Sequence, residues 1–163
     1  GISGNAGLFS DANDLAKLYQ MWLNKGTYGG EEYLSDKTCM VFTNAKSGIS
    51  RRGLGFDKPE INTNKSSPTS LSTPVSVYGH TGFTGTCFWI DPDNNMIYIF
   101  LSNRVYDKRT HKAIMRLNIR ERIQEEIYKA MRKGTDSSQT KTIQINPDNK
   151  TYTKDYDPTD SNQ

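Results

Sequence analysis

The residues best suited to chemistry lie in a glycine-dense stretch, where residues 78–86 read Tyr-Gly-His-Thr-Gly-Phe-Thr-Gly-Thr. His80 and Thr81 place an imidazole and a hydroxyl between two glycines, and both groups can bind a ligand. The same stretch is typical of a glycine-rich bulge that enters a β-strand. An isolated histidine is also more often a hydrogen-bonded structural residue. A lone His-x-Gly is therefore a weak signal, and its meaning depends on the elements around it.

The two cysteines and the second histidine, His111, give little support to further chemistry. Cys39 and Cys87 are isolated in the sequence, which is typical of two buried thiols, with one disulfide as the alternative. His111 lies among lysines and an arginine, where a solvated side chain is expected. No Cys-x-x-Cys pair accompanies the histidines, so the spacing does not support a zinc site.

The elements that must position His80 begin with a hairpin. Residues 86–90 and 96–101 are rich in apolar side chains, and the polar residues 91–95 between them predict a turn. Neither strand alternates apolar with polar residues, which indicates burial on both faces. We therefore expect helices or other layers on both sides of an antiparallel sheet. Residues 53–57 are consistent with a further short strand.

Helices are predicted on both sides of the hairpin in the sequence. Ser10 or Asp11 can cap a helix that extends to about residue 24 and ends before Gly26, and Ser35 can cap a second, shorter helix. The apolar residues of the first recur at spacings of three and four: Leu15, Leu18, Tyr19, Trp22 and Leu23.

A third, amphipathic helix is predicted from about residue 118 to residue 133. Asn118 and Glu121 have capping-box spacing, and Glu125 and Lys129 form a favourable i,i+4 pair. The expected core-facing stripe is Ile119, Ile123, Ile127, Ala130 and Met131, and the opposite face carries Arg120, Glu121 and further charged residues. This stripe is the natural cover for one face of the sheet.

Composition fits one domain with a polar end. The 163 residues suffice for a hydrophobic core, although only 34% are hydrophobic. The net charge of +3 is spread along the chain, so the sequence does not support nucleic-acid binding.

Residues 58–74 read as a long exposed loop, of the kind that is functional or disordered. Residues 135–163 are polar, and we expect a flexible tail there.

Four segments in order resemble one known family. Residues 80–82 resemble the Lys-Thr-Gly or His-x-Gly signature of serine β-lactamases, D-alanyl-D-alanine peptidases and related esterases. Residues 4–16 look like the stretch that follows the family's second motif, and residues 88–104 look like the hairpin after the third. The last helix looks like the one that closes the fold. The resemblance runs from about residue 2 to residue 133.

The resemblance implies roles for four residues. His80, Thr81 and Gly82 would bind the substrate on the strand that lines the active site, with His80 holding charge near a substrate carboxylate. Gly82 would let the acyl chain approach the strand closely because it has no Cβ. The backbone N–H of Phe83 would stabilise the oxyanion of the tetrahedral intermediate.

The family's nucleophile is not found where the resemblance would place it. Serine is a weak nucleophile until a base takes its proton, and the family uses Ser-x-x-Lys for this. The one instance, Ser138 to Lys141, lies in the polar tail after the third motif, and neither Tyr-x-Asn nor Ser-Asp-Asn occurs. We expect the catalytic serine and lysine upstream of Gly1, and we expect the chain alone to be inactive.

The sequence thus predicts an α+β fold, an antiparallel β-sheet with packed helices that forms the C-terminal portion of the β-lactamase/transpeptidase-like fold. Residues 1–134 would form this partial domain. The parent would be a serine hydrolase of the cell envelope or periplasm that forms an acyl-serine intermediate with β-lactams, peptidoglycan stem peptides or esters. No metal or organic cofactor is implied.

Two other functions remain open, a non-catalytic module that binds peptidoglycan-like carboxylates and a structural interaction domain. The expected partners are a small-molecule or peptidoglycan-type substrate and the missing N-terminal part of the same protein. Nucleic acid is not expected as a partner. A sheet edge left open would also favour self-association.

Overall fold

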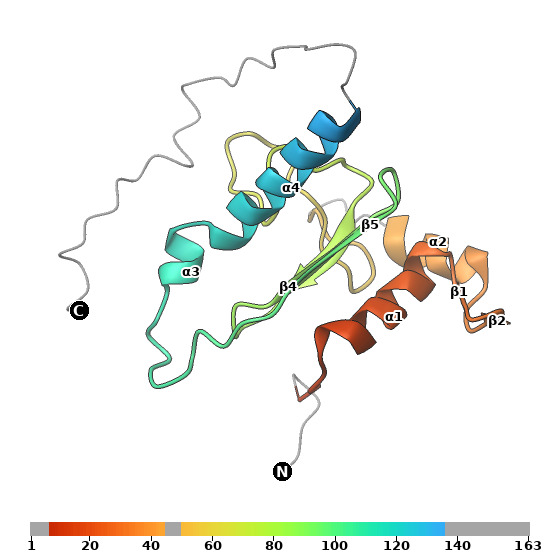
Figure 1. The fold of residues 1–163 in the computed structure, drawn as a ribbon, viewed down its shortest axis with the longest axis horizontal. Helices are drawn as coiled ribbons and strands as arrows, with labels where there is room; N and C mark the ends of the chain where they lie inside the picture. The colour runs from red at the N-terminus through yellow and green to blue at the C-terminus, as the bar shows by residue number, and fades with distance from the viewer. Residues whose placement is uncertain (1–6, 45–49, 136–163) are drawn as a thin grey trace.

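Three antiparallel strands form the centre of the molecule (Figure 1). The computed structural model describes residues 7–44 and 50–135. The sheet order is β3-β4-β5, with β3 at Tyr78–Thr81, β4 at Cys87–Asp91 and β5 at Met96–Phe100. The predicted hairpin is confirmed to within one residue at each end, and so is the α+β fold class.

Helix α1, Ala12–Leu23, begins and ends as its sequence predicts. The Asp11 carboxylate accepts hydrogen bonds from the backbone N–H groups of Asn13 and Asp14, at 2.8 and 3.0 Å. Asp11 is therefore the cap and Ser10 is not. Gly26 ends the helix with φ of 104°, and a Cβ there would lie 1.9 Å from the carbonyl oxygen of Leu34. Only glycine fits this position.

A small hairpin and a second helix follow α1. Strands β1, Thr27–Tyr28, and β2, Glu31–Glu32, pair across the Gly29–Gly30 turn. Helix α2, Asp36–Asn44, starts where the sequence predicts, because Ser35 Oγ accepts a hydrogen bond from Thr38 N–H at 3.1 Å.

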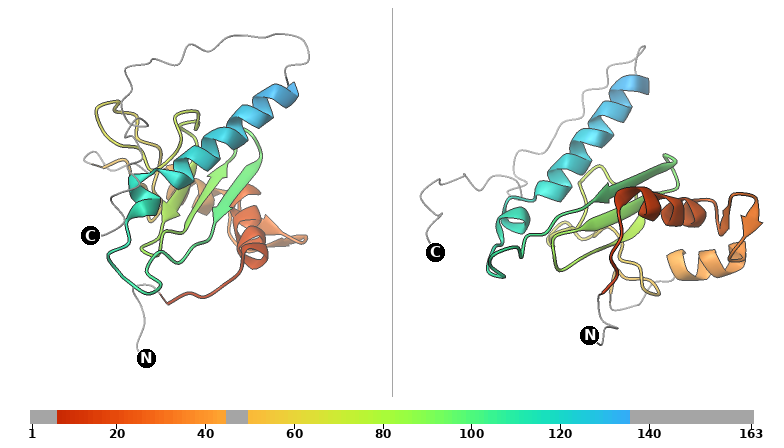
Figure 2. Two further views of the ribbon diagram at one scale, coloured as in Figure 1. Left: turned by 60° about the vertical axis from the view of Figure 1, so that its left-hand side comes forward. Right: turned by 60° about the horizontal axis from the view of Figure 1, so that its bottom comes forward.

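Apolar side chains cover both faces of the sheet, as the unbroken apolar strands predict. On the α1 face, Tyr19 stacks on Phe88 with ring centroids 4.0 Å apart, and Ile90 is fully buried beside them. On the opposite face, Trp89 packs with Tyr98 and with Ile127 of helix α4, Ile119–Thr135. Figure 2 shows the strands between α1 and α4.

The buried face of α4 differs from the predicted stripe. The buried residues are Arg120, Glu121, Gln124 and Tyr128, whereas Ile123 is 41% exposed. Ile127 does pack on the sheet, but Ala130 is exposed. Polar contacts set this orientation, because the Tyr98 hydroxyl donates to Arg120 O at 3.0 Å and Gln124 Oε1 accepts from Ser70 N–H at 2.9 Å. A pattern of apolar residues does not reveal such contacts.

Smaller departures accompany this one. Lys129 forms its ion pair with Glu126, at 2.7 Å, instead of with Glu125. Glu125 accepts a hydrogen bond from the Ser72 hydroxyl, also at 2.7 Å. A four-residue helix, α3 at Ala113–Arg116, precedes α4 and was not predicted.

Residues 50–77, which precede β3, follow an irregular path. The predicted strand over 53–57 is reduced to one bridge, between Asp57 and Gly79. No helix within the described residues is long and apolar enough to cross a membrane. The tail at 136–163, with Ser138 and Lys141, lies outside the described residues.

We expect Tyr128→Phe to lower the free energy of unfolding by about 2 kcal/mol, since a hydrogen bond to a buried charged group is lost. The Tyr128 hydroxyl donates to Asp91 Oδ2 at 2.6 Å, and Asp91 is fully buried. Burial, and then the bond to Asp91, raise the pKa of Tyr128, so the hydroxyl remains a donor. Urea unfolding measures the change. Tyr33→Phe, at an exposed tyrosine, is the control, and an equal loss there would contradict the prediction.

Candidate active site at the outer edge of strand β3

Strand β3 pairs with β4 on one side, and its other side meets Asp57. Asp57 N–H donates to Gly79 O at 2.7 Å, and Gly79 N–H donates to Asp57 O at 3.0 Å. The backbone groups of Gly79 therefore point away from β4. Because these directions alternate along an antiparallel strand, those of Thr81 point the same way, and those of His80 point toward Phe88. The outer edge of β3 thus presents the backbone of Thr81.

The His80 side chain is held through both ring nitrogens. Arg52 Nη1 lies 3.1 Å from His80 Nε2, and His80 Nδ1 lies 2.7 Å from Thr81 O. A guanidinium only donates hydrogen bonds, and a carbonyl oxygen only accepts them. In this geometry Nε2 accepts from Arg52 and Nδ1 donates to Thr81 O. The positive charge of Arg52 thus lies beside the strand, next to His80.

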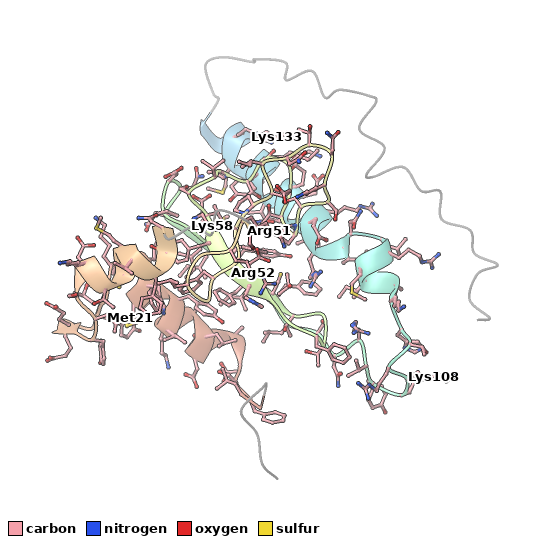
Figure 3. The ribbon with its side chains drawn as sticks, turned by 180° about the vertical axis from the view of Figure 1, so that it is seen from behind. Met21, Arg51, Arg52, Lys58, Lys108 and Lys133 are labelled. Atoms are coloured by element: carbon pink, nitrogen blue, oxygen red, sulfur yellow. The ribbon has the colours of Figure 1, made fainter. Side chains whose placement is uncertain are left out.

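Two adjacent arginines share one buried carboxylate but differ in exposure. Arg51 donates to both oxygens of Asp57, at 2.7 and 2.9 Å, and the Asp57 side chain is 1% exposed. Arg52 Nη2 lies farther from Asp57, at 3.6 Å, and its side chain is 50% exposed. Arg51 thus binds the buried carboxylate through two nitrogens, whereas the Arg52 side chain is more exposed to solvent. Figure 3 shows these two arginines beside the sheet, seen from behind.

A tight turn follows the strand and projects Phe83. Gly82 N–H donates to Thr86 O at 2.8 Å, and Gly85 N–H donates to Gly82 O at 3.0 Å. Phe83 is 62% exposed, and no described residue accepts a hydrogen bond from its N–H. A backbone donor without an acceptor among the described residues is available to an external acceptor.

Two contacts from the chain after β5 fix this turn. The hydroxyl of Ser102 and the backbone N–H of Arg104 both donate to Thr84 O, at 3.0 and 2.9 Å. Gly85 adopts φ of 93°, and a Cβ there would lie 2.6 Å from Ser102 Oγ. The turn is therefore anchored to the end of the sheet.

Gly79 and Gly82 are required by packing within the protein. A Cβ at Gly79 would lie 2.0 Å from Phe88 O, and one at Gly82 would lie 2.2 Å from Thr86 Oγ1. Glycine in a strand often marks such a close approach. The role of Gly82 in admitting an acyl chain stays a prediction beside this internal reason.

The cysteines are not activated. Cys39 and Cys87 are both free and buried. Burial raises the pKa of Cys87 to about 12, and it also raises the pKa of Cys39, where Asp36 adds to the effect. Both thiols stay protonated near neutral pH, so neither is a ready nucleophile. Within residues 7–44 and 50–135, no three His, Cys, Asp or Glu residues form a group suited to a metal ion.

Comparison with known proteins identifies the family of this chain. A family model described as Beta-lactamase matches residues 1–120, which include β3, the turn and both arginines. The chain belongs to the β-lactamase family. The match supports the resemblance of the chain to the β-lactamase and penicillin-binding-protein type of hydrolase.

Named relatives in this family agree with the match. Proteins of Salmonella paratyphi B and Salmonella newport, each named "Putative D-alanyl-D-alanine carboxypeptidase", are 46% identical to this chain over 107 residues. That segment is 64% of this chain and 24% of each relative. The family member described here thus matches about a quarter of the length of these relatives.

The structure brings the predicted site residues together and adds two that sequence reasoning missed. His80 and Thr81 lie on β3, and Gly82 and Phe83 follow directly. Arg52 and Asp57 contact this strand from a segment more than 20 residues earlier. Their only signal was a pair of arginines before a glycine-rich stretch, which does not indicate where the side chains lie.

We expect Gly82→Ala to destabilise the protein by about 1–3 kcal/mol, because the new methyl group collides with Thr86 Oγ1. A second substitution, Thr86→Ala, removes that oxygen. The double variant should regain most of the loss relative to Thr86→Ala alone, as judged by thermal unfolding. If it does not, the side chain of Thr86 is not what requires glycine at 82.

Proposed function

We propose that this chain is the C-terminal part of a serine hydrolase that cleaves amides or esters through an acyl-serine intermediate. Its membership of the β-lactamase family supports this proposal, as does its match to only 24% of each relative. The nucleophilic serine and its lysine would lie on an upstream segment, since no Ser-x-x-Lys precedes the third motif here. By this proposal the chain alone is not catalytically competent, and its partner is the N-terminal part of the same protein.

The observation that carries the proposal is Arg52 beside the third motif. Its guanidinium is half-exposed, and its position is fixed by His80 and Asp57. A planar guanidinium presents several N–H donors, which suits a carboxylate. We assign Arg52 to the substrate carboxylate. His80 and Thr81 then act together, because His80 orients Arg52 and Thr81 presents its backbone at the outer edge of the strand.

Phe83 N–H would be one donor of the oxyanion hole. Phe83 is an exposed residue, and no described residue accepts a hydrogen bond from its N–H. Both observations support this role. The anchored turn keeps the donor fixed, so that little reorganisation accompanies the development of charge. The second donor would come from the nucleophile's own segment. The Phe83 side chain is not needed for this step.

Among the substrate classes, we favour peptides that end in D-alanyl-D-alanine, since the similar proteins carry a D-alanyl-D-alanine carboxypeptidase name. β-Lactams and simple esters share the acyl chemistry. A cell-envelope location fits such a substrate. The second candidate function is a module that binds the same carboxylates without turnover, and Arg52 favours it equally.

We expect Arg52→Gln to weaken binding of acetyl-D-alanyl-D-alanine about tenfold, because a charge-assisted hydrogen bond is lost. Chemical-shift titration of the 163-residue chain measures the dissociation constant. Lys37→Gln, which removes one exposed charge from α2, is the matched control. The same peptide with an amidated C-terminus, which lacks the carboxylate, should bind weakly to both variants. An unchanged constant in Arg52→Gln would refute the assignment.

The isolated chain should also self-associate through the sheet. Among the described strands, β5 pairs only with β4, and Leu101 at its end is 45% exposed. An unpaired strand edge is a template for another strand, and a charge there opposes pairing. Sedimentation should therefore show dimers that Leu101→Lys shifts toward monomer. Leu71→Lys, on an exposed loop, should leave them intact. A strictly monomeric 163-residue chain would contradict this prediction.

A further inference from the structure

A second concentration of positive charge, separate from Arg52, lies after β5 and contacts the turn that follows β3. Residues 104–112, which we call the basic loop, hold four Lys and Arg side chains against one carboxylate, Asp107. Their net charge of +3 equals that of the whole chain. Three of the four cationic residues, Lys108, Arg109 and Lys112, are exposed. Figure 3 labels Lys108, far from Lys133 at the end of α4.

The basic loop is fastened to the candidate site by Arg104. Its Nη1 donates to the carbonyl oxygens of Arg109 and His111, at 3.2 and 2.9 Å. Its backbone N–H donates to Thr84 O inside the turn. These bonds set the position of the loop before any ligand arrives, so that less ordering accompanies binding.

Two guanidinium groups lie against the exposed ring of Phe83. The Cζ atoms of Arg104 and Arg109 lie 4.6 and 5.7 Å from its centroid, within the range of cation–π contacts. Arg104 already serves the loop through its carbonyl bonds. The Arg109 side chain is exposed, and among the described residues it contacts this ring. Arg109 can thus meet an anion while the ring holds its guanidinium in place.

We propose that Arg109, positioned by Phe83 and the basic loop, recognises a second acidic group on the substrate. This inference rests on the proposed function and deepens it, since it names the substrate class as peptides with a carboxylate at each end. His80 contacts Arg52, and Phe83, three residues further along the chain, contacts Arg109. A ligand with one carboxylate at Arg52 and another at Arg109 would therefore lie across the turn that follows β3.

Two peptides that differ only in the second acidic group test this inference. Succinyl-D-alanyl-D-alanine and acetyl-D-alanyl-D-alanine share the C-terminal carboxylate, but only the first has an acid at the other end. We expect the 163-residue chain to bind the succinyl peptide about threefold more tightly, the effect of one exposed ion pair. The preference should shrink at high salt, because exposed charges are screened.

The variants test whether Arg109 causes the preference. Arg109→Gln should reduce the ratio of the two affinities to about one, whereas Arg109→Lys, which keeps the charge, should retain most of it. Lys37→Gln is the matched control, because α2 lies at the other end of the molecule from the basic loop (Figure 1). A purely structural Arg109 would change the affinity for both peptides equally and leave the ratio unaltered.

The outcomes separate the two proposals. Equal affinities in the wild-type chain, or a ratio that survives Arg109→Gln, overturn the inference, while dependence on Arg52 would keep the proposed function. Affinities for both peptides that are unchanged in Arg52→Gln, together with a succinyl preference that needs Arg109, support the inference and refute the carboxylate assignment of Arg52. If neither peptide binds, both proposals fall.

Discussion

The buried carboxylate of Asp57 is the interaction on which the edge of β3 depends. A charge with 1% exposure is costly unless it is paired and hydrogen-bonded, and Arg51 and the Lys58 N–H meet that need. The same residue joins the backbone of Gly79 from outside the sheet. One side chain thus fixes the path of residues 51–57 and the place of Arg52 beside His80. The electrostatics of the candidate site follow from a structural ion pair.

The parts of the fold that could be predicted are those set by local chemistry. Asp11 and Ser35 cap helices because their side-chain oxygens accept from backbone groups within three residues. The unbroken apolar runs of β4 and β5 required cover on both faces, and α1 and α4 supply it. Sequence spacing is enough for such features, since they depend on neighbours in the chain.

Features that depend on distant polar partners escaped prediction. The face that α4 buries is set by Tyr98, Ser70 and Asp91, which bond to it from other elements. The contact of His80 with Arg52 likewise joins residues 28 positions apart. Motif order pointed to strand β3, but the arginines beside that strand come from a segment with no recognisable motif. The family resemblance therefore did not indicate which distant side chains lie next to the strand.

The bond between Arg52 and His80 also ties the evolution of two positions. His80 accepts from a guanidinium, and a lysine in its place could only donate. Two cations would then meet at 3.1 Å beside the Asp57 carboxylate that already serves Arg51. A lineage that exchanges histidine for the lysine of Lys-Thr-Gly must therefore change position 52 as well, or let that arginine turn away.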